Sequence, residues 1–217
     1  MEFLIDFLLH LDNHLIAMVN EYGTLTYAIL FLIIFTETGL IVMPFLPGDS
    51  LLFAAGAIAA LPNSALNIYI IIPLLIVAAL LGDNVNYFVG RFAGDFVKSK
   101  ERILFFKRDY IIQTEAFYAK HGAKTIIMAR FVPIVRTVAP FVAGAGSMKY
   151  QNYLLNCVIG ALLWVIGLTT MGFLFGNIPI VKNNFEKVIL AIIVISVLPM
   201  VIALLKGKRK KSNPSTF

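Results

Sequence analysis

The chain has 217 residues, of which 59% are hydrophobic and only 14% are charged, and its mean hydropathy is +0.87. An average soluble domain is about 45–50% apolar, so this composition excludes an ordinary soluble fold, and it is too apolar for disorder. The single cysteine excludes a disulfide scaffold and any multi-cysteine metal centre. We therefore expect an all-α membrane protein with a single membrane domain over residues 1–217.

The net charge of +6 is distributed very unevenly along the chain. Residues 1–90 contain no Lys or Arg, and the basic residues gather in 91–124 and in the tail 206–217. The positive-inside rule places both basic segments, and with them the C-terminus, on the cytoplasmic side of the membrane. This placement beside the predicted spans, and not in one solvent-facing stripe, does not indicate a nucleic-acid partner.

The N-terminal segment, residues 1–22, has the pattern of an amphipathic helix lying in the membrane interface. Its apolar residues share one helical face and its acidic residues another. It has no basic stretch of the kind that begins a cleavable signal peptide. His10 and His14 are four residues apart but lack an obvious third ligand, so we expect neither a metal nor another cofactor.

Three apolar stretches are predicted to be ordinary spanning helices, at 66–89, 153–175 and 188–205. Each is close to the roughly 20 residues that a bilayer core requires. At the inner end of the first of them, Asp83 and Arg91 are too far apart along a helix to pair, and the glycines around them favour close helix packing, so both are expected to support structure. Cys157 and Trp164 are interpreted as lipid-facing or packing residues.

Two further apolar stretches, 24–61 and 125–148, are broken by prolines, glycines and charges. The first contains Glu37, Thr38, Gly39, Pro44, Pro47, Gly48 and Asp49. The second contains Arg130, Pro133, Arg136, Pro140, Gly144 and Gly146. Such residues break a helix, and broken backbone cannot face lipid. We expect two re-entrant helical hairpins that face each other from opposite sides of the membrane, as in transporters built from inverted repeats. A full crossing within 24–61, and hence the side of the N-terminus, remains open.

Four charged residues are predicted to lie at membrane depth, Glu37 and Asp49 in the first hairpin and Arg130 and Arg136 in the second. Left unpaired, they would cost on the order of 10–14 kcal/mol, so they must pair or share a hydrated cavity. The two guanidiniums suit a phosphate or carboxylate headgroup, and the two acids suit a proton that competes with it. Internal salt bridges with no functional role are the alternative interpretation.

At these residues the sequence resembles the DedA family of bacterial inner-membrane proteins, also called the SNARE-associated or VTT domain. The resemblance is carried by Phe35–Gly39, Pro44–Leu52, Gly82–Arg91 and Ala129–Thr137, with Pro140 and Ala143–Gly144. It implies a transporter or flippase that recycles undecaprenyl phosphate and depends on proton motive force. It also implies that Glu37 and Asp49 are the functional acids and Arg130 and Arg136 the functional arginines. Pro47, Gly48, Pro133, Pro140 and Gly144 are expected to support them.

Several other functions remain to be weighed against a lipid transporter. A lipid phosphatase would need a nucleophile, and the three histidines all lie outside the hairpins, so we expect no enzyme. A proton-coupled carrier of small solutes would use the same four charges, and a phospholipid scramblase is known among relatives. The expected partners are a membrane lipid and protons, and self-association into a homo-oligomer is left open.

Overall fold

The computed structural model describes residues 21–40, 48–62, 64–99, 102–103, 106–107, 118, 122–146, 148–176, 178–182, 187–188 and 191. Over these residues the protein is almost entirely helical. A pair of two-residue strands, β1 (Arg102–Ile103) and β2 (Phe106–Lys107), is antiparallel. Nearly all of the predicted interfacial helix 1–22, most of the third predicted span 188–205 and the tail 206–217 lie outside the described residues.

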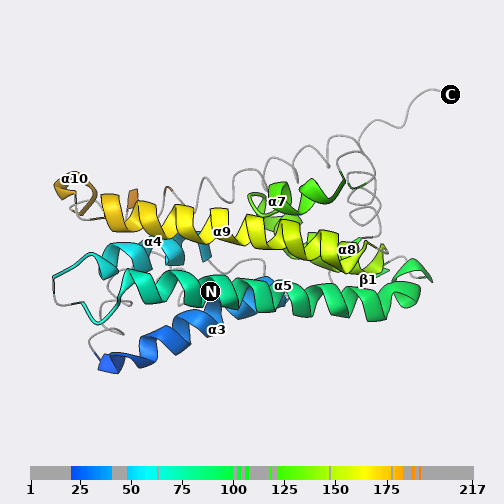
Figure 1. The fold of residues 1–217 in the computed structure, drawn as a ribbon, viewed down its shortest axis with the longest axis horizontal. Helices are drawn as coiled ribbons and strands as arrows, with labels where there is room; N and C mark the ends of the chain where they lie inside the picture. The colour runs from blue at the N-terminus through cyan, green and yellow to red at the C-terminus, as the bar shows by residue number, and fades with distance from the viewer. Residues whose placement is uncertain are drawn as a thin grey trace, which may run out of the picture.

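Two long antiparallel helices form the frame of the molecule, α5 (Ile68–Ser99) and α9 (Tyr150–Phe175) (Figure 1). Their apolar stretches, Ile68–Phe92 and Tyr150–Phe175, have mean hydropathies of 2.2 and 2.1 and are long enough to cross a membrane. Only about a third of each stretch is buried inside the protein, which leaves large apolar faces outward. Two of the three predicted spans are thus present as helices, although α5 continues ten residues beyond the predicted end at residue 89.

Both stretches predicted to be broken are pairs of shorter helices. The first consists of α3 (Leu25–Gly39) and α4 (Gly48–Ala59), with the proline-rich part of the stretch between them. The second consists of a short 3₁₀ turn, η1 (Gly122–Lys124), followed by α7 (Thr125–Ala129) and α8 (Pro133–Ala145). Pro133 begins α8, where its missing N–H removes no helical hydrogen bond. Both stretches are therefore broken, as the sequence predicts, but Pro140 and Gly144 do not break the second one, because α8 continues through both of them to Ala145.

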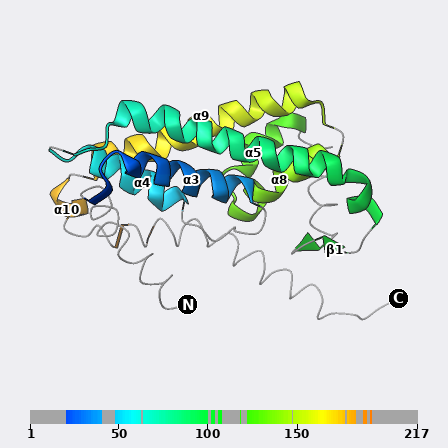
Figure 2. The ribbon, with the colours of Figure 1, turned by 90° about the horizontal axis from the view of Figure 1, so that it is seen from below.

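The two helix pairs occupy opposite halves of the frame. In Figure 1, α3 and α4 lie along the left half of α5 and α9, while α7 and α8 lie along the right half, and Figure 2 shows the same division from below. α3 packs mainly on α5 and α4 on α9, whereas α7 packs on α9 and α8 on α5. The facing ends of these two helix pairs consequently meet near the middle of the molecule (Figure 1).

The α4–α9 and α8–α5 crossings use the same contact. Phe53–Ala57 of α4 reads Phe-Ala-Ala-Gly-Ala, and Phe141–Ala145 of α8 reads Phe-Val-Ala-Gly-Ala. In both helices the glycine lies directly against the partner helix, so that an added Cβ would strike a backbone carbonyl. The carbonyls are those of Thr169 for Gly56 and Tyr87 for Gly144. In return, a glycine of each long helix lies against the phenylalanine carbonyl of the shorter one. The two halves therefore share one packing scheme.

Hydrophobic side chains fill the interior at both ends of the frame. One cluster is formed by residues of α3, α4, α5 and α9, with Leu30, Leu52 and Leu75 fully buried. The other lies among α5, α7, α8 and α9 and includes Tyr87, Tyr153 and Cys157. Between the two clusters the interior is polar, and the buried charges described below are found there.

Candidate functional site

The helix breaks bring the four predicted charged residues together at the centre of the molecule. Glu37 lies in the last turn of α3 and Asp49 in the first turn of α4. Arg130 follows α7 directly, and Arg136 is in the first turn of α8. They lie beside Asp83 of α5, which is about 22 Å along that helix from its first residue and so near the middle of its apolar stretch.

Arg136 joins the two helix pairs through both of its terminal nitrogens. Its Nη2 bonds Glu37 Oε1, and its Nη1 bonds Asp49 Oδ1 at 3.0 Å. Glu37 is 1% exposed and the Arg136 side chain 7%, whereas the Asp49 side chain is 21% exposed. One guanidinium fork therefore holds two carboxylates from two helices, an arrangement that the single point charge of a lysine could not reproduce.

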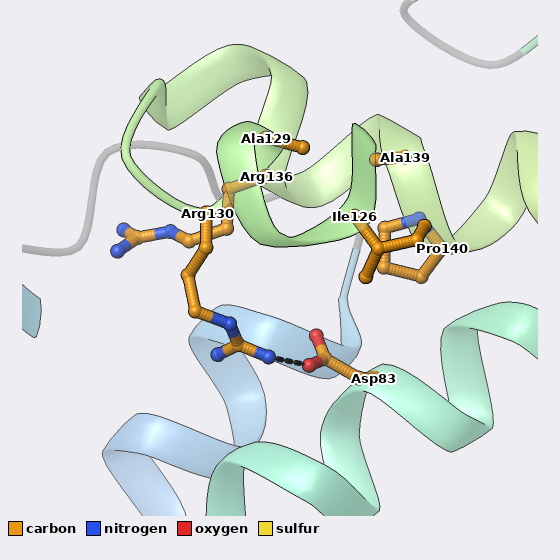
Figure 3. A pocket seen from close by; sticks show the side chains of 7 residues that line it. All are labelled: Asp83, Ile126, Ala129, Arg130, Arg136, Ala139 and Pro140. Atoms are coloured by element: carbon orange, nitrogen blue, oxygen red, sulfur yellow. Dashed lines mark hydrogen bonds and ion pairs between the residues drawn. The ribbon is translucent and has the colours of Figure 1, made fainter. Parts of the chain in front are cut away.

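Arg130 takes a different partner from the one that the sequence suggested. The sequence suggested that the two arginines are matched by the two hairpin acids. Arg130 instead pairs with Asp83 of α5, as the dashed line in Figure 3 shows. Cys157 Sγ donates to the same carboxylate at 3.1 Å, and the Tyr153 hydroxyl donates to the backbone carbonyl of Asp83 at 2.8 Å. Asp83 is 2% exposed and is part of the charge cluster itself. The interpretation of Asp83 as packing support alone was therefore incomplete.

Trp164 of α9 lies between the two ion pairs. Its indole Nε1 donates to Asp49 Oδ1 at 2.7 Å. The guanidinium carbons of Arg136 and Arg130 lie over its ring, at 4.7 and 5.5 Å from the ring centre. At 3% exposure Trp164 is a packing residue and does not face lipid, and Cys157 is likewise fully buried. Of the two interpretations that the sequence left open for these residues, packing is confirmed.

Asn86 ties the backbone of both helix pairs to α5. Its amide donates to the carbonyl of Thr137 at 2.7 Å and, more weakly, to that of Thr38 at 3.5 Å. These are the residues that directly follow Arg136 and Glu37. Asn86 is fully buried, and its Oδ1 has no hydrogen-bond partner among the described residues. Sequence reasoning gave it no role.

A small cavity opens beside the two arginines and is seen from close by in Figure 3. It is lined by Asp83, Ile126, Ala129, Arg130, Arg136, Ala139 and Pro140. Its size is about that of one water molecule. Within the described part of the chain, Arg130 Nη1 and Arg136 Nε are buried without a hydrogen-bond partner. Such buried donors are costly to leave unpaired, so the arginine side of the cavity can bind a further hydrogen-bond acceptor.

The predicted supporting residues have different roles. Gly48 lies against the Glu37 carboxylate, where a Cβ would collide with it, and Gly144 permits the α8–α5 crossing. Pro140 lines the cavity. Arg91 is exposed near the end of α5, away from the cluster. Pro47 lies outside the described residues, and of Pro133 only its position at the start of α8 is described.

A signal for the residues that were missed does exist in the sequence. Tyr153, Cys157 and Trp164 follow one another at intervals of four and seven residues, which places them on one face of a helix. A polar or polarisable face in the middle of a span predicts contact with other polar groups rather than with lipid.

Among the described residues, no group of three or more His, Cys, Asp and Glu side chains is arranged to hold a metal.

The fold and the buried charges define a helical membrane protein with a polar centre, and the comparisons give its family. The VTT domain model matches residues 46–174, and the chain belongs to this family, the DedA family. Protein DedA of Escherichia coli (strain K12) is 55% identical over 95% of this chain and 94% of its own length. An uncharacterized membrane protein of Mycobacterium leprae (strain TN) is 44% identical over 83% of this chain and 80% of its own length. The inner membrane protein YqjA of Escherichia coli (strain K12) is 32% identical over 89% of this chain and 86% of its own length. No solved structure matches.

Proposed function

We propose that the protein is a proton-motive-force-dependent transporter of a membrane lipid with a phosphate monoester headgroup, with undecaprenyl phosphate as the substrate. The observation that carries the proposal is the pair of buried arginines beside the central cavity, each with a guanidinium nitrogen that has no hydrogen-bond partner among the described residues. Guanidinium N–H groups bind phosphate oxygens with short, charge-assisted hydrogen bonds. A phosphate monoester carries about −1.5 to −2 charges at neutral pH, which two arginines can balance.

The helix pairs α3–α4 and α7–α8 are, in this proposal, re-entrant hairpins that enter from opposite faces of the inner membrane. Their location in opposite halves of the frame and their shared glycine contact support this reading. The basic residues after α5 and in the tail support a cytoplasmic C-terminus, with residues 188–205 as a third span. The printed name of the YqjA relative, an inner membrane protein, supports the location.

In this proposal, the structure corresponds to a closed state of the transporter. Room for about one water molecule is too little for a phosphate headgroup, so the hairpins must separate before the lipid enters. Because each hairpin bonds the other through Arg136, a headgroup that takes this arginine would also release Glu37 and Asp49. Binding of substrate and opening of the site would then be one event.

The charge balance of the cluster supports the binding of a proton. The cluster of described residues holds three carboxyl groups, those of Glu37, Asp49 and Asp83, against two guanidiniums. A buried cluster with an uncompensated charge is costly, so one bound proton would make it neutral. Glu37 has a buried oxygen without a hydrogen-bond partner within the described residues, which suits it for the proton. Asp49, the most exposed of the three, suits exchange with water.

The apolar tail of the lipid needs no polar contacts with the protein. The outward faces of α5 and α9 carry large exposed apolar side chains, among them Tyr69, Leu163 and Leu174. A polyprenyl chain can stay in the bilayer along these faces while its headgroup crosses at the centre. Uptake of one proton per headgroup would couple the step to the pH gradient, worth about 1.4 kcal/mol per pH unit.

The proposal is tested by binding to the purified protein in nanodiscs. The three ligands are undecaprenyl phosphate, the neutral alcohol undecaprenol and inorganic phosphate. We expect saturable binding of the lipid phosphate that exceeds binding of the alcohol by at least about tenfold, a difference of about 1.4 kcal/mol. Equal affinity for the alcohol would contradict a headgroup role for the arginines. Saturable binding of inorganic phosphate alone would instead identify a carrier of small anions.

A further inference from the structure

Helix α4 begins in the interior of the molecule, beside the buried charges. Its first residue, Gly48, is buried, and its first turn also contains Asp49. The first N–H groups of a helix have no partner within the helix, and they carry the positive end of the helix dipole. Such helix starts bind phosphate and other anions, and the broken helices of transporters direct them at anionic substrates. The start of α4 therefore needs an acceptor from another part of the chain.

The carboxylate of Glu37, which belongs to α3, lies at this helix start. It contacts Gly48, where an added Cβ would collide with both of its oxygens. The backbone N–H of Gly48 hydrogen-bonds the same carboxylate, and Arg136 Nη2 bonds its Oε1. Two positive groups of different kinds, a helix N-terminus and a guanidinium, thus converge on one negative group. This is the arrangement of an anion site, and in this structure the anion is a side chain of the protein itself.

The arginines at this site can bind more acceptors than the Glu37 carboxylate supplies. The Arg136 side chain is 7% exposed, and its Nε has no hydrogen-bond partner among the described residues. The neighbouring Arg130 has a buried Nη1 that also lacks a partner in the described part of the chain. A carboxylate offers two oxygens and one charge, whereas a phosphate monoester offers three oxygens and about −1.5 to −2 charges. A phosphate in the place of Glu37 can therefore keep the bonds to Gly48 and Arg136 and add one to a further guanidinium nitrogen.

Glu37 and Asp49 are placed differently relative to this site. Asp49 is in the first turn of α4 and accepts hydrogen bonds from Arg136 Nη1 and Trp164 Nε1. It therefore moves with the helix that forms the site. Glu37 is in the last turn of α3, a separate helix, so it can withdraw from Gly48 when α3 and α4 move apart. Of the two acids, Glu37 is the one that a headgroup can replace.

We propose that the N-terminus of α4 and Arg136 form the site of the phosphate headgroup, and that the Glu37 carboxylate occupies this site in the closed state. This inference rests on the proposed function and goes further, because it names the backbone group that holds the headgroup and makes Glu37 its competitor. Removal of the competing carboxylate should then strengthen the binding of phosphate. If Glu37 served the fold alone, its removal would leave that binding unchanged or weaken it.

The first test removes the competing carboxylate. In nanodiscs, Glu37→Ala and Glu37→Gln should each bind undecaprenyl phosphate about fivefold or more tightly than the wild-type protein, while binding of undecaprenol should not change. Glu21→Gln, at an exposed position before α3, is the matched control and should bind as the wild type does. Equal or weaker binding of the lipid phosphate by the Glu37 variants would overturn the inference. Thermal unfolding identifies a misfolded variant, and if Glu37→Ala is misfolded, Glu37→Gln decides.

The second test asks whether the headgroup lies against Gly48. The substitution Gly48→Ala is made in the Glu37→Ala background, where no Glu37 carboxylate remains to collide with the new Cβ. The double variant should bind the lipid phosphate about tenfold or more weakly than Glu37→Ala alone. Gly167→Ala in the same background is the matched control and should have no effect, because a Cβ there meets nothing within 4 Å. A double variant that binds as tightly as Glu37→Ala would show that Gly48 accommodates Glu37 alone.

The outcomes distinguish this inference from the function on which it rests. If neither the wild type nor the Glu37 variants bind undecaprenyl phosphate more tightly than undecaprenol, the proposed function is contradicted. If the wild type prefers the lipid phosphate but the Glu37 variants show no gain, the site at α4 alone is contradicted. Inorganic phosphate is measured in parallel. The same gain and loss with this ion, without binding of the lipid, would support the anion site and contradict the lipid as substrate.

Discussion

Asp83 and Arg130, which are 47 positions apart in the chain, form a buried ion pair between α5 and the end of α7. Each side chain is 3% exposed, so neither charge can turn to water without movement of the helices. Cys157 contacts both members, which makes the pair part of the α9 contact as well. The pair therefore fixes the second helix pair to both long helices.

Asp83→Asn should destabilise the protein strongly, by about 3–5 kcal/mol, because it leaves the Arg130 guanidinium buried without its counterion. The double variant Asp83→Leu with Arg130→Met removes both charges and should recover most of that stability. It should nevertheless remain inactive, since the headgroup site has lost one arginine. Thermal unfolding in detergent and transport in proteoliposomes measure the two effects. Full transport by the double variant would show that the Asp83–Arg130 ion pair serves stability alone.

Arg130→Lys and Arg136→Lys should each lose most transport although the charge is kept. A lysine ammonium cannot span Glu37 and Asp49 as Arg136 does, nor bind a phosphate with two parallel N–H groups. Arg91→Lys, at an exposed position, is the matched control and should transport normally. Activity above about half of wild type in both site variants would contradict direct headgroup binding by the planar fork.

Glu37→Gln and Asp49→Asn should fold and insert normally but lose the dependence of transport on a pH gradient. Each amide keeps the shape of the carboxyl group and removes its proton exchange. Glu21→Gln, an exposed position before α3, serves as the control. Transport rates are measured with and without an imposed gradient, and assembly is measured by size-exclusion chromatography. Misassembly of both site variants would favour salt bridges that serve stability alone.

Gly48→Ala should reduce transport by about tenfold or more, since its Cβ would displace the Glu37 carboxylate from Arg136. This variant changes the position of the Glu37 carboxylate and leaves the charge of the site unchanged. Gly167→Ala in α9 is the matched substitution, because a Cβ there meets nothing within 4 Å. It should keep transport and stabilise the helix by up to about 1 kcal/mol. Equal activity of the two variants would show that the Glu37 position is not critical.

Helix type and helix breaks were accessible from the sequence because they depend on local features. Gly39, Gly48 and Pro133 stand at helix ends, where breaks were expected. Pro140 and Gly144 lie inside α8 and do not end it. The pairing of Arg130 with Asp83 was not accessible, since it depends on which long helix each short helix crosses. That choice is set by small contacts such as Gly144 against Tyr87, which no periodicity reveals. Trp164 was given no role because the sequence alone does not show which residues of the other helices its face of α9 contacts.

The central claim is that a lipid phosphate crosses at the arginines under the control of a proton. It is tested most directly by the inward movement of undecaprenyl phosphate in proteoliposomes with an imposed pH gradient and membrane potential. We expect acceleration by the pH gradient, up to about tenfold per pH unit if one proton accompanies each headgroup, with no movement of undecaprenol and no gradient dependence in Glu37→Gln. Equal movement of the alcohol, or a rate unaffected by the gradient in the wild-type protein, would contradict the account.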